Sequence, residues 1–421
     1  MRGRAAVAWA AAWAVIGCAG CTASPAHPAA ASQSPSRAAA SPTTASVALK
    51  LPGRGLPSPG CSTATAKSAL LGNVRTAMVP TGAGPFGVAV APDGRWAFVA
   101  LPGSIEVLRI GSSLAPVKVA SIPVATQAGN LGETLSPDGR YLLAADGSGA
   151  VVVSVTRAEQ DRPDAVLGTL TDPAAGNGAI EVAVSPGDGY AFVTEEDSQR
   201  AAVFNLHRAL AQGFSAADFV GTIPLGIAPV GLAVSPDGRW LYVTSEAAPS
   251  QHPSQLGMQG TLTVVSLPRA ETDPARAVVA TVAAGCSPVR VITSADGREV
   301  WVTARESDDL LCFSAARLLD DPARALVAIV RVGAAPVGLM LVRNGSLIVV
   351  ADSDRFLQPG AKAGLSVVSV IAAVAGKPAV LGRIPAGQFP REMALVPGGQ
   401  TLLVGNYASG QLEAVSVPSL P

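Results

Sequence analysis

The chain has 421 residues, of which 49% are hydrophobic and only 14% are charged. Its 30 Lys and Arg residues balance its 30 Asp and Glu residues, so the formal net charge is zero. This balance argues against a nucleic-acid binder that relies on bulk positive charge, and the apolar composition argues against a disordered chain.

The N-terminus has the pattern of a bacterial export signal. A head with two arginines precedes the apolar run Ala5–Ile16, which is too short to span a bilayer comfortably. The stretch Val15-Ile16-Gly17-Cys18 resembles the lipobox of bacterial lipoproteins, in which the Cys is lipidated after cleavage. We therefore predict a signal peptide over residues 1–17 and a lipid anchor at Cys18. The protein is then exported and held on the outer side of the bacterial cell membrane.

A second Cys and a tether follow this signal. Cys21 is an alternative lipidation site, and an ordinary secretory signal with chance cysteines is the alternative to a lipoprotein. Residues 22–60 are rich in Ala, Ser, Pro and Thr and lack the periodic apolar residues that bury a core. We predict that residues 18–65 form a flexible tether and that the folded domain spans residues 66–421.

The folded part repeats one unit about every 50 residues, a period typical of propeller blades. Each unit is an apolar strand, a tight turn of the Pro-Asp-Gly kind, and a second apolar strand, which predicts a β-hairpin. Seven copies are present, at residues 87–99, 132–144, 181–193, 231–243, 290–302, 338–350 and 392–404.

Two further strands are expected in each unit. Thr261–Leu267 is an example of a third strand, and Val278–Val282 is an example of a fourth. The last unit ends after its third strand, Gln411–Val417, while Asn73–Val79, before the first unit, looks like a fourth strand. We therefore predict an all-β protein, a seven-bladed β-propeller with four antiparallel strands per blade. Its N-terminal strand completes the last blade and removes an open edge.

The repeat resembles that of the YVTN-repeat and lactonase-like seven-bladed propellers of bacteria. The resemblance is carried by Pro229-Val-Gly-Leu-Ala-Val-Ser-Pro-Asp-Gly-Arg-Trp-Leu-Tyr-Val-Thr244 and its copies, and it covers Asn73 to Val417. Members of such families include sugar-lactone hydrolases, cell-surface proteins and a propeller that contacts DNA. The resemblance therefore implies a fold more strongly than a function.

A candidate site lies where the first strand of each blade begins, at the mouth of the central channel. We call this the top face; the Asp-Gly turns lie on the bottom face. Four of the seven equivalent positions are Gly, which we expect to leave the mouth open. The other three are Glu181, Arg290 and Glu392, and their neighbours in sequence include Glu133 and Arg391. A charge at a narrow mouth needs a partner or water. We expect either an ion network that plugs the ring or a site for a small polar ligand.

Loops after the second strands add charges to the top face. Glu195, Arg305 and Asp352 complete the candidate ligand-binding set, in an acidic rim where Ca²⁺ is a minority possibility. Two long loops, 246–260 and 352–364, have the length of binding loops. The top-loop aromatics are Tyr407, Phe356 and Phe389, few for a carbohydrate site.

The five cysteines are too scattered for a metal framework. Cys286 and Cys312 both fall in or beside the fifth unit, so we expect that they can form a disulfide in an oxidising compartment. Cys61 has no obvious partner in the sequence.

No catalytic residue or cofactor is assigned by a motif, because the chain has no G-x-S-x-G elbow, P-loop or H-E-x-x-H. The sequence favours an envelope lipoprotein that binds a small polar ligand or another envelope protein through its top face. A lactonase-like hydrolase is the alternative, with Glu181 or Glu392 as base and Arg290 as oxyanion stabiliser. Carbohydrate binding and DNA contact rank lower.

Overall fold

The computed structural model describes residues 61, 65–124, 132–173, 178–248, 258–356, 362–374 and 377–421. All belong to the second of two units, Met1–Ser46 and Val47–Pro421. The predicted signal peptide, Cys18 and most of the predicted tether lie outside the described residues. No helix among those described is long and apolar enough to cross a membrane.

The described residues form seven four-stranded antiparallel sheets, as the repeat predicts. Blade 1 contains β2 (Val88–Val90), β3 (Trp96–Leu101), β4 (Ser104–Arg109) and β5 (Val117–Pro123). Blade 2 contains β6 (Glu133–Leu135), β7 (Tyr141–Asp146), β8 (Gly149–Ser154) and β9 (Val166–Thr171). Blade 3 contains β10 (Ala179–Val184), β11 (Tyr190–Glu195), β12 (Arg200–Asn205) and β13 (Phe219–Pro224). Blade 4 contains β14 (Ile227–Val234), β15 (Trp240–Ala247), β16 (Gln259–Ser266) and β17 (Val278–Cys286).

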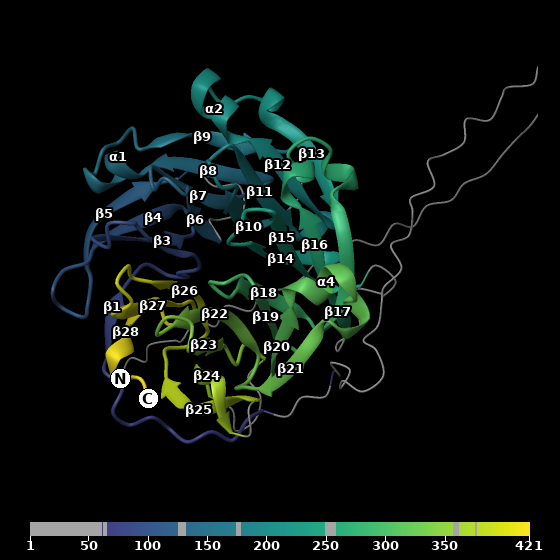
Figure 1. The fold of residues 1–421 in the computed structure, drawn as a ribbon. Helices are drawn as coiled ribbons and strands as arrows, with labels where there is room; N and C mark the ends of the chain where they lie inside the picture. Colours follow the sequence, from purple (N-terminus) through teal and green to yellow (C-terminus); the bar gives the residue numbers. More distant parts are fainter. Residues whose placement is uncertain are drawn as a thin grey trace, which may run out of the picture. The chain divides into compact units, whose positions relative to one another are not determined.

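The remaining blades follow the same order. Blade 5 contains β18 (Pro288–Thr293), β19 (Glu299–Ala304), β20 (Asp309–Ser314) and β21 (Leu326–Arg331). Blade 6 contains β22 (Pro336–Val342), β23 (Leu347–Asp352), β24 (Gly364–Val374) and β25 (Lys377–Pro385). Blade 7 contains β26 (Pro390–Leu395), β27 (Thr401–Asn406), β28 (Gln411–Ser416) and β1 (Thr76–Pro80). Each first strand contacts the first strands of the two adjacent blades, so these seven strands surround the central channel (Figure 1).

The N-terminal strand closes the ring as predicted. β1 pairs with β28 in antiparallel register, with Thr76 opposite Val415 and Pro80 opposite Gln411. This pairing covers the edge that blade 7 would otherwise expose.

The turn between the first two strands of a blade is built by its own side chains. In blade 4 the Ser235 hydroxyl donates to Asp237, which also accepts from the backbone N–H of Arg239, and Gly238 has a φ of 68°. Only glycine adopts such a left-handed φ without strain. Arg239, which follows this glycine in the turn, lies over the ring of Trp240.

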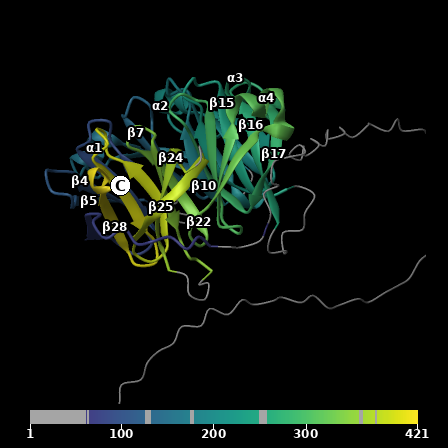
Figure 2. The ribbon, with the colours of Figure 1, turned by 60° about the horizontal axis from the view of Figure 1, so that its bottom comes forward.

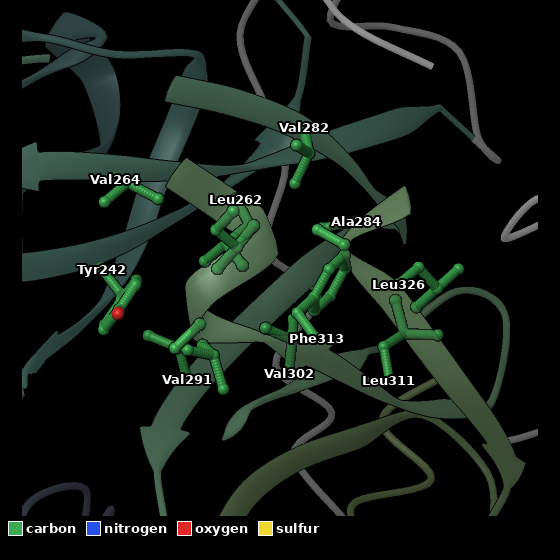
Figure 3. Close-up of a cluster of buried hydrophobic side chains, with 14 of the residues drawn as sticks. Tyr242, Leu262, Val264, Val282, Ala284, Val291, Val302, Leu311, Phe313 and Leu326 are labelled. Carbon is green, nitrogen blue, oxygen red and sulfur yellow. The ribbon is translucent and has the colours of Figure 1, made fainter. Parts of the chain in front are cut away.

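Hydrophobic side chains fill the space between neighbouring blades. Figure 3 shows one such cluster, in which Tyr242 and Leu262 of blade 4 pack toward Val302 and Phe313 of blade 5. These four side chains are almost fully buried. The packing explains why both faces of the second and third strands are apolar, since each sheet is buried on both sides.

Short helices, which the repeat pattern did not predict, join the third and fourth strands of blades 2 to 5. They are α1 (Val155–Glu159), α2 (Leu206–Gln212), α3 (Leu267–Ala270) and α4 (Ala315–Asp320), and Figure 2 shows them along one side of the ring. Five single-turn 3₁₀ helices are also described: η1 (Glu196–Ser198), η2 (Ala216–Asp218), η3 (Pro274–Arg276), η4 (Pro322–Arg324) and η5 (Val417–Ser419). Each of α1, α2 and α4 begins after a Ser or Asn whose side chain caps the first turn.

The expected Cys286–Cys312 disulfide is wrong. Cys286 is bonded to Cys61, with their Cα atoms 5.3 Å apart, and Cys312 is a free, buried thiol in β20. Cys312 faces a hydrophobic cluster with Trp301 and Leu310, whereas Cys286 ends β17 at the top face.

The disulfide holds Cys61, and the described residues 65–75 form a strap that runs past blades 5 and 6 before β1 joins blade 7 (Figure 1). The Thr65 hydroxyl donates to Asp308, and the backbone N–H of Ala66 donates to the carbonyl of Val332, both at blade 5. The backbone N–H of Leu71 donates to the carbonyl of Arg383 in blade 6. The described residues at the end of the predicted tether, Cys61 and Thr65, are therefore both bound to the propeller.

Candidate binding sites in and above the central channel

A repeated backbone kink positions the side chains at the channel. The residue eight positions before each turn proline, or its equivalent, has a left-handed φ in every blade where it is described. These residues are Gly84, Gly178, Ala228, Ser287, Ala335 and Phe389. A positive φ is unusual for non-glycine residues, so its recurrence in four of them marks a geometry that the fold imposes.

The second, third and fourth residues after the kink form three tiers around the channel, from top to bottom. The described cap tier is Phe86, Ile180, Val230, Val289, Val337 and Arg391. The charged tier is Gly87, Gly132, Glu181, Gly231, Arg290, Gly338 and Glu392. The lower tier is Val88, Glu133, Val182, Leu232, Val291, Leu339 and Met393.

The charged tier contains an ion network across the channel. Arg290 Nε donates to Glu392 Oε1 at 2.6 Å, and Arg290 Nη2 lies 3.1 Å from Glu181 Oε2. Blades 5, 7 and 3 thus contribute one residue each. Burial lowers the pKa of Arg290, but Glu392 and Glu181 together raise it more, so the guanidinium stays charged. Burial raises the pKa of Glu181 to about 8 against the opposing effect of Arg290.

The glycines of this tier do not leave the mouth open, contrary to expectation. A Cβ on Gly132 would lie 2.3 Å from the Glu181 carboxylate, and one on Gly338 would overlap the carbonyl of Arg391 in the next blade. One on Gly231 would lie 2.4 Å from the carbonyl of Val289. Glycine is therefore required here because the neighbouring strand occupies the space.

A threonine in the second strand of blades 3, 4 and 5 links each blade to the next. The Thr244 hydroxyl accepts from the backbone N–H of Gly231 at 3.0 Å and donates to the carbonyl of Val289 at 2.9 Å. Thr303 makes the same two bonds, to Arg290 and to Val337 of blade 6. Thr194 makes them in blade 3. This bond pair gives a physical role to the Thr that follows an aromatic residue and Val in the second strand of blades 3, 4 and 5.

Glu133 is the single charged residue of the lower tier. Glu133 is 8% exposed, and its carboxyl group has no side-chain partner among the described residues; only the backbone N–H groups of Ala89 and Ala100 lie close enough to interact with it. Burial raises the pKa of Glu133 to about 8; nearby backbone amides lower it, and Glu181 raises it further. Glu133 lines a cavity of about 160 Å³ with Glu181, Arg290 and Glu392, so four of the predicted site residues meet at one place.

Above the charged tier, valines close the channel toward the top. Val230, Val289 and Val337 form a buried cluster, against which Ile180 and Phe389 pack. The ion network therefore lies beneath an apolar layer and not at an open top mouth.

Arg391 replaces an apolar residue in this cap tier and is surrounded by aromatic rings. Its guanidinium carbon lies 3.8 Å from the centre of the Phe86 ring, 4.9 Å from that of Phe389 and 5.7 Å from that of Tyr407. Burial lowers the pKa of Arg391, and so does the positive charge of Arg290. The Nε atom is buried without a hydrogen-bond partner among the described residues.

Two further arginines extend this cluster across the top face. Arg355 lies over the rings of Phe356 and Phe389, at 5.6 and 5.5 Å. Arg305 lies 5.6 Å from the Phe356 ring and donates to Glu246 at 2.8 Å. We call Arg305, Arg355, Arg391 and the rings of Phe86, Phe356, Phe389 and Tyr407 the arginine–aromatic cluster. The sequence showed these aromatics as scattered, because they come from loops of three blades.

Two predicted site residues lie elsewhere. Glu195 is buried between strands, where it accepts from Arg200 at 2.6 Å. Asp352 accepts from the backbone N–H of Gly333 and from the Ser366 hydroxyl. Both carboxylates bond to their own or adjacent strands and do not join the channel or the cluster. Arg305 does join the cluster.

No group of three or more Asp, Glu, His or Cys residues in the described part of the chain is arranged to hold a metal ion. The two long loops are described only in part, and His252 lies outside the described residues.

Comparisons with known proteins support the fold. Residues 133–283 match the Choice-of-anchor I domain family. No curated protein matches the chain. A structure of hydrazine synthase from Kuenenia stuttgartiensis is similar over 80% of this chain and 97% of that one, with 14% identity and a TM-score of 0.60. A chain in the structure of the mitotic checkpoint complex is similar over 87% of this chain and 98% of that one, with 15% identity and a TM-score of 0.61. At such identities the two structures show a shared propeller fold, and the family match suggests an exported cell-surface protein.

Proposed function

We propose that the protein is a cell-surface β-propeller scaffold that binds a carboxylate group at its top face, presented by a small ligand or by an envelope protein. The arginine–aromatic cluster carries this proposal. The family match, which suggests a surface protein, and the export signal support the location.

The geometry of Arg391 suits it to carboxylate recognition. A ring that covers the face of a guanidinium leaves the N–H groups at its edge directed outward, and these groups match the two oxygens of a carboxylate. Arg355 and Arg391 have no ion-pair partner within 4.0 Å among the described residues, whereas Arg305 is paired with Glu246. Burial lowers the pKa of Arg355 and the positive charge of Arg305 lowers it further, and a bound anion would relieve this repulsion.

An exposed aromatic ring supports the same surface. Phe356 is 44% exposed, although its ring contacts two arginines. Exposed aromatics beside arginines are enriched in binding surfaces, where both residue types contribute strongly to affinity.

The lipid anchor at Cys18 and the resemblance to YVTN-repeat propellers are part of this proposal. Described contacts to the propeller begin at Cys61, on the top edge of blade 4. The 43 residues from Cys18 to Gly60 would have a root-mean-square reach of roughly 35 Å as a flexible chain. Such a tether would let the top face meet partners near the membrane.

The lactonase alternative receives no support. Its proposed base and stabiliser, Glu392 and Arg290, are bonded to each other beneath the apolar cap. A general base that is already bonded to the oxyanion stabiliser is poorly placed for acyl transfer.

Calorimetric titration of the exported chain with galacturonate and with a hexaglutamate peptide tests the proposal. We expect binding of one of these probes. An Arg391→Lys variant should lose at least tenfold in affinity, because lysine lacks the planar guanidinium whose paired N–H groups match the two carboxylate oxygens. Arg95→Lys, a change at an exposed turn on the bottom face, is the matched control. Binding that Arg391→Lys leaves unchanged, or no binding of either probe, would overturn the proposal.

A further inference from the structure

The lower half of the channel contains more negative groups than its cation can balance. Glu133, Glu181 and Glu392 line one cavity with a single arginine, Arg290. Arg290 contacts Glu181 and Glu392, so no cation in the described chain pairs with Glu133. A buried, unpaired carboxylate is unfavourable unless it is protonated or meets a cation.

Glu133 is more than nine-tenths buried and lines the cavity, and no side-chain donor or cation of the described residues pairs with it; only the backbone N–H groups of Ala89 and Ala100 approach its carboxyl group. Buried polar groups in native proteins almost always have a partner. A carboxyl group that has only backbone amides near it and no cation, beside a cavity, therefore indicates a cationic partner that comes from outside the described chain.

The walls below the carboxyl groups are apolar. The cavity of about 160 Å³ is lined by Leu232, Ile292 and Met340 in addition to its charged residues. A second cavity of about 300 Å³ shares Glu133, Glu181 and Leu232 with it. It reaches Pro137 and Val234, which adjoin the turns of the bottom face.

The two cavities share Glu133, Glu181 and Leu232, and from this we infer one passage that begins below the cap tier and reaches the bottom face. The buried valine cluster of the cap tier lies above it, and the bottom turns lie at its other end. A ligand that enters from below would place its leading group against the carboxylates and its remainder against Leu232, Ile292 and Met340.

We propose that this passage binds a primary ammonium group on an unbranched alkyl chain, with the ammonium between Glu133 and Glu181. This binding is independent of the proposed carboxylate site, because it uses the opposite face of the ring. An ammonium has three N–H donors and a compact charge, which suit two neighbouring carboxylates. The alkyl chain would replace water against the apolar walls.

The size of the cavity suits a short chain. A volume of about 160 Å³ is roughly five times the share of one water in the liquid, so the upper cavity has room for a four-carbon ammonium. Two sources offer this group: a free alkylamine and a lysine side chain of a partner protein.

Titration of the exported chain with n-butylammonium at pH 7.5 tests the proposal. We expect one site per chain, and at least tenfold weaker binding of 1-butanol, which has the same chain without the charge. The groups that face the site are Glu133, Glu181 and Glu392, with Arg290 beside them and Arg391 above. Because the raised pKa of Glu133 and of Glu181 keeps protons on these carboxyl groups at pH 7.5, binding of the ammonium should displace protons. The proton release is measured by repeating the titration in buffers of different ionisation enthalpy.

Variants distinguish this site from binding elsewhere. Glu133→Gln should weaken butylammonium binding at least tenfold and reduce the proton release, while Asp320→Asn, at an exposed acid of α4, should change neither. If Glu133→Gln does not fold, Glu133→Asp serves in its place, with a smaller loss expected because its charge is kept but displaced. Butanol binding as tightly as butylammonium, or a folded Glu133 variant binding like the wild type, would overturn the proposal.

One further probe, compared with butylammonium, separates the sources. Nα-acetyl-lysine amide should bind if the natural ligand is a lysine side chain, and the free amine alone should bind if the passage admits only small molecules. No binding of either probe at 10 mM would also overturn the proposal.

Discussion

Arg290 in blade 5 and Glu392 in blade 7 meet across the central channel, with Nε and Oε1 2.6 Å apart. They are 102 residues apart in the chain, and they lie in blades that are not adjacent in the ring. Because Glu181 of blade 3 approaches the same guanidinium, one buried cation connects three blades. This network therefore links blades 3, 5 and 7 to one another across the channel.

Removing the cation should destabilise the ring more than removing the whole network. Arg290→Met leaves Glu181 and Glu392 buried without their cation, which we expect to cost about 3–5 kcal/mol of unfolding free energy. The triple variant Arg290→Met, Glu181→Gln, Glu392→Gln should recover part of that loss, because no charge then remains unpaired. Urea unfolding measures both. Equal destabilisation of the single and triple variants would contradict this reading.

The threonine between blades should be sensitive to loss of its hydroxyl alone. Thr244→Val keeps the shape of the side chain but leaves the N–H of Gly231 and the carbonyl of Val289 without a partner. Because an unsatisfied buried group costs about 1–3 kcal/mol, we expect a loss in that range or above it. Thr244→Ser, which keeps the hydroxyl, is the control and should lose less. Equal unfolding free energies of Thr244→Val and Thr244→Ser in denaturant unfolding would contradict this role of the hydroxyl.

The stability of the protein should depend on pH through Glu133. Its pKa is about 8 in the fold, above the ordinary value of 4.5, so between these two values the folded state holds a proton that the unfolded chain has released. Stability from this group is therefore fully present below pH 4.5 and falls as pH rises toward 8, by about 1.4 kcal/mol per unit.

Glu133→Gln removes this dependence. The difference in unfolding free energy between the variant and the wild type should increase in favour of the variant from pH 5 to pH 8. Asp320→Asn should give a curve parallel to that of the wild type. Parallel curves for Glu133→Gln as well would show that Glu133 ionises normally.

The Cys61–Cys286 disulfide should stabilise the propeller through its strap. A Cys61→Ser, Cys286→Ser double variant should lose about 2–5 kcal/mol, the usual range for a native disulfide. The strap should then become accessible to proteases near residues 65–75. Cys312→Ser is the control, because this thiol lies in a hydrophobic cluster and burial raises its pKa well above the ordinary range. Mass spectrometry of a non-reduced digest that shows Cys286 joined to Cys312 would contradict the pairing.

The repeat in the sequence determined the architecture. Each hairpin is specified locally, by a tight turn of the Pro-Asp-Gly kind and by apolar strands on either side, so the seven copies and the missing fourth strand could be counted without a structure. The closure by Thr76–Pro80 follows from the same count. The sequence also placed Glu181, Arg290 and Glu392 at equivalent positions of different blades, which is why their meeting at the channel could be predicted.

Only the tertiary structure decided what these positions contact. The strap brings Cys61 to Cys286 over a separation of 225 residues, a pairing that no local spacing indicates. The space beside the glycines of the charged tier is occupied by atoms of the neighbouring blade. The rings around Arg391 come from three separate loops. Turn and strand preferences act within a few residues, whereas the partner of a buried charge, a thiol or a ring is set by how whole blades pack. That packing is a property of the closed ring and is not contained in any one repeat.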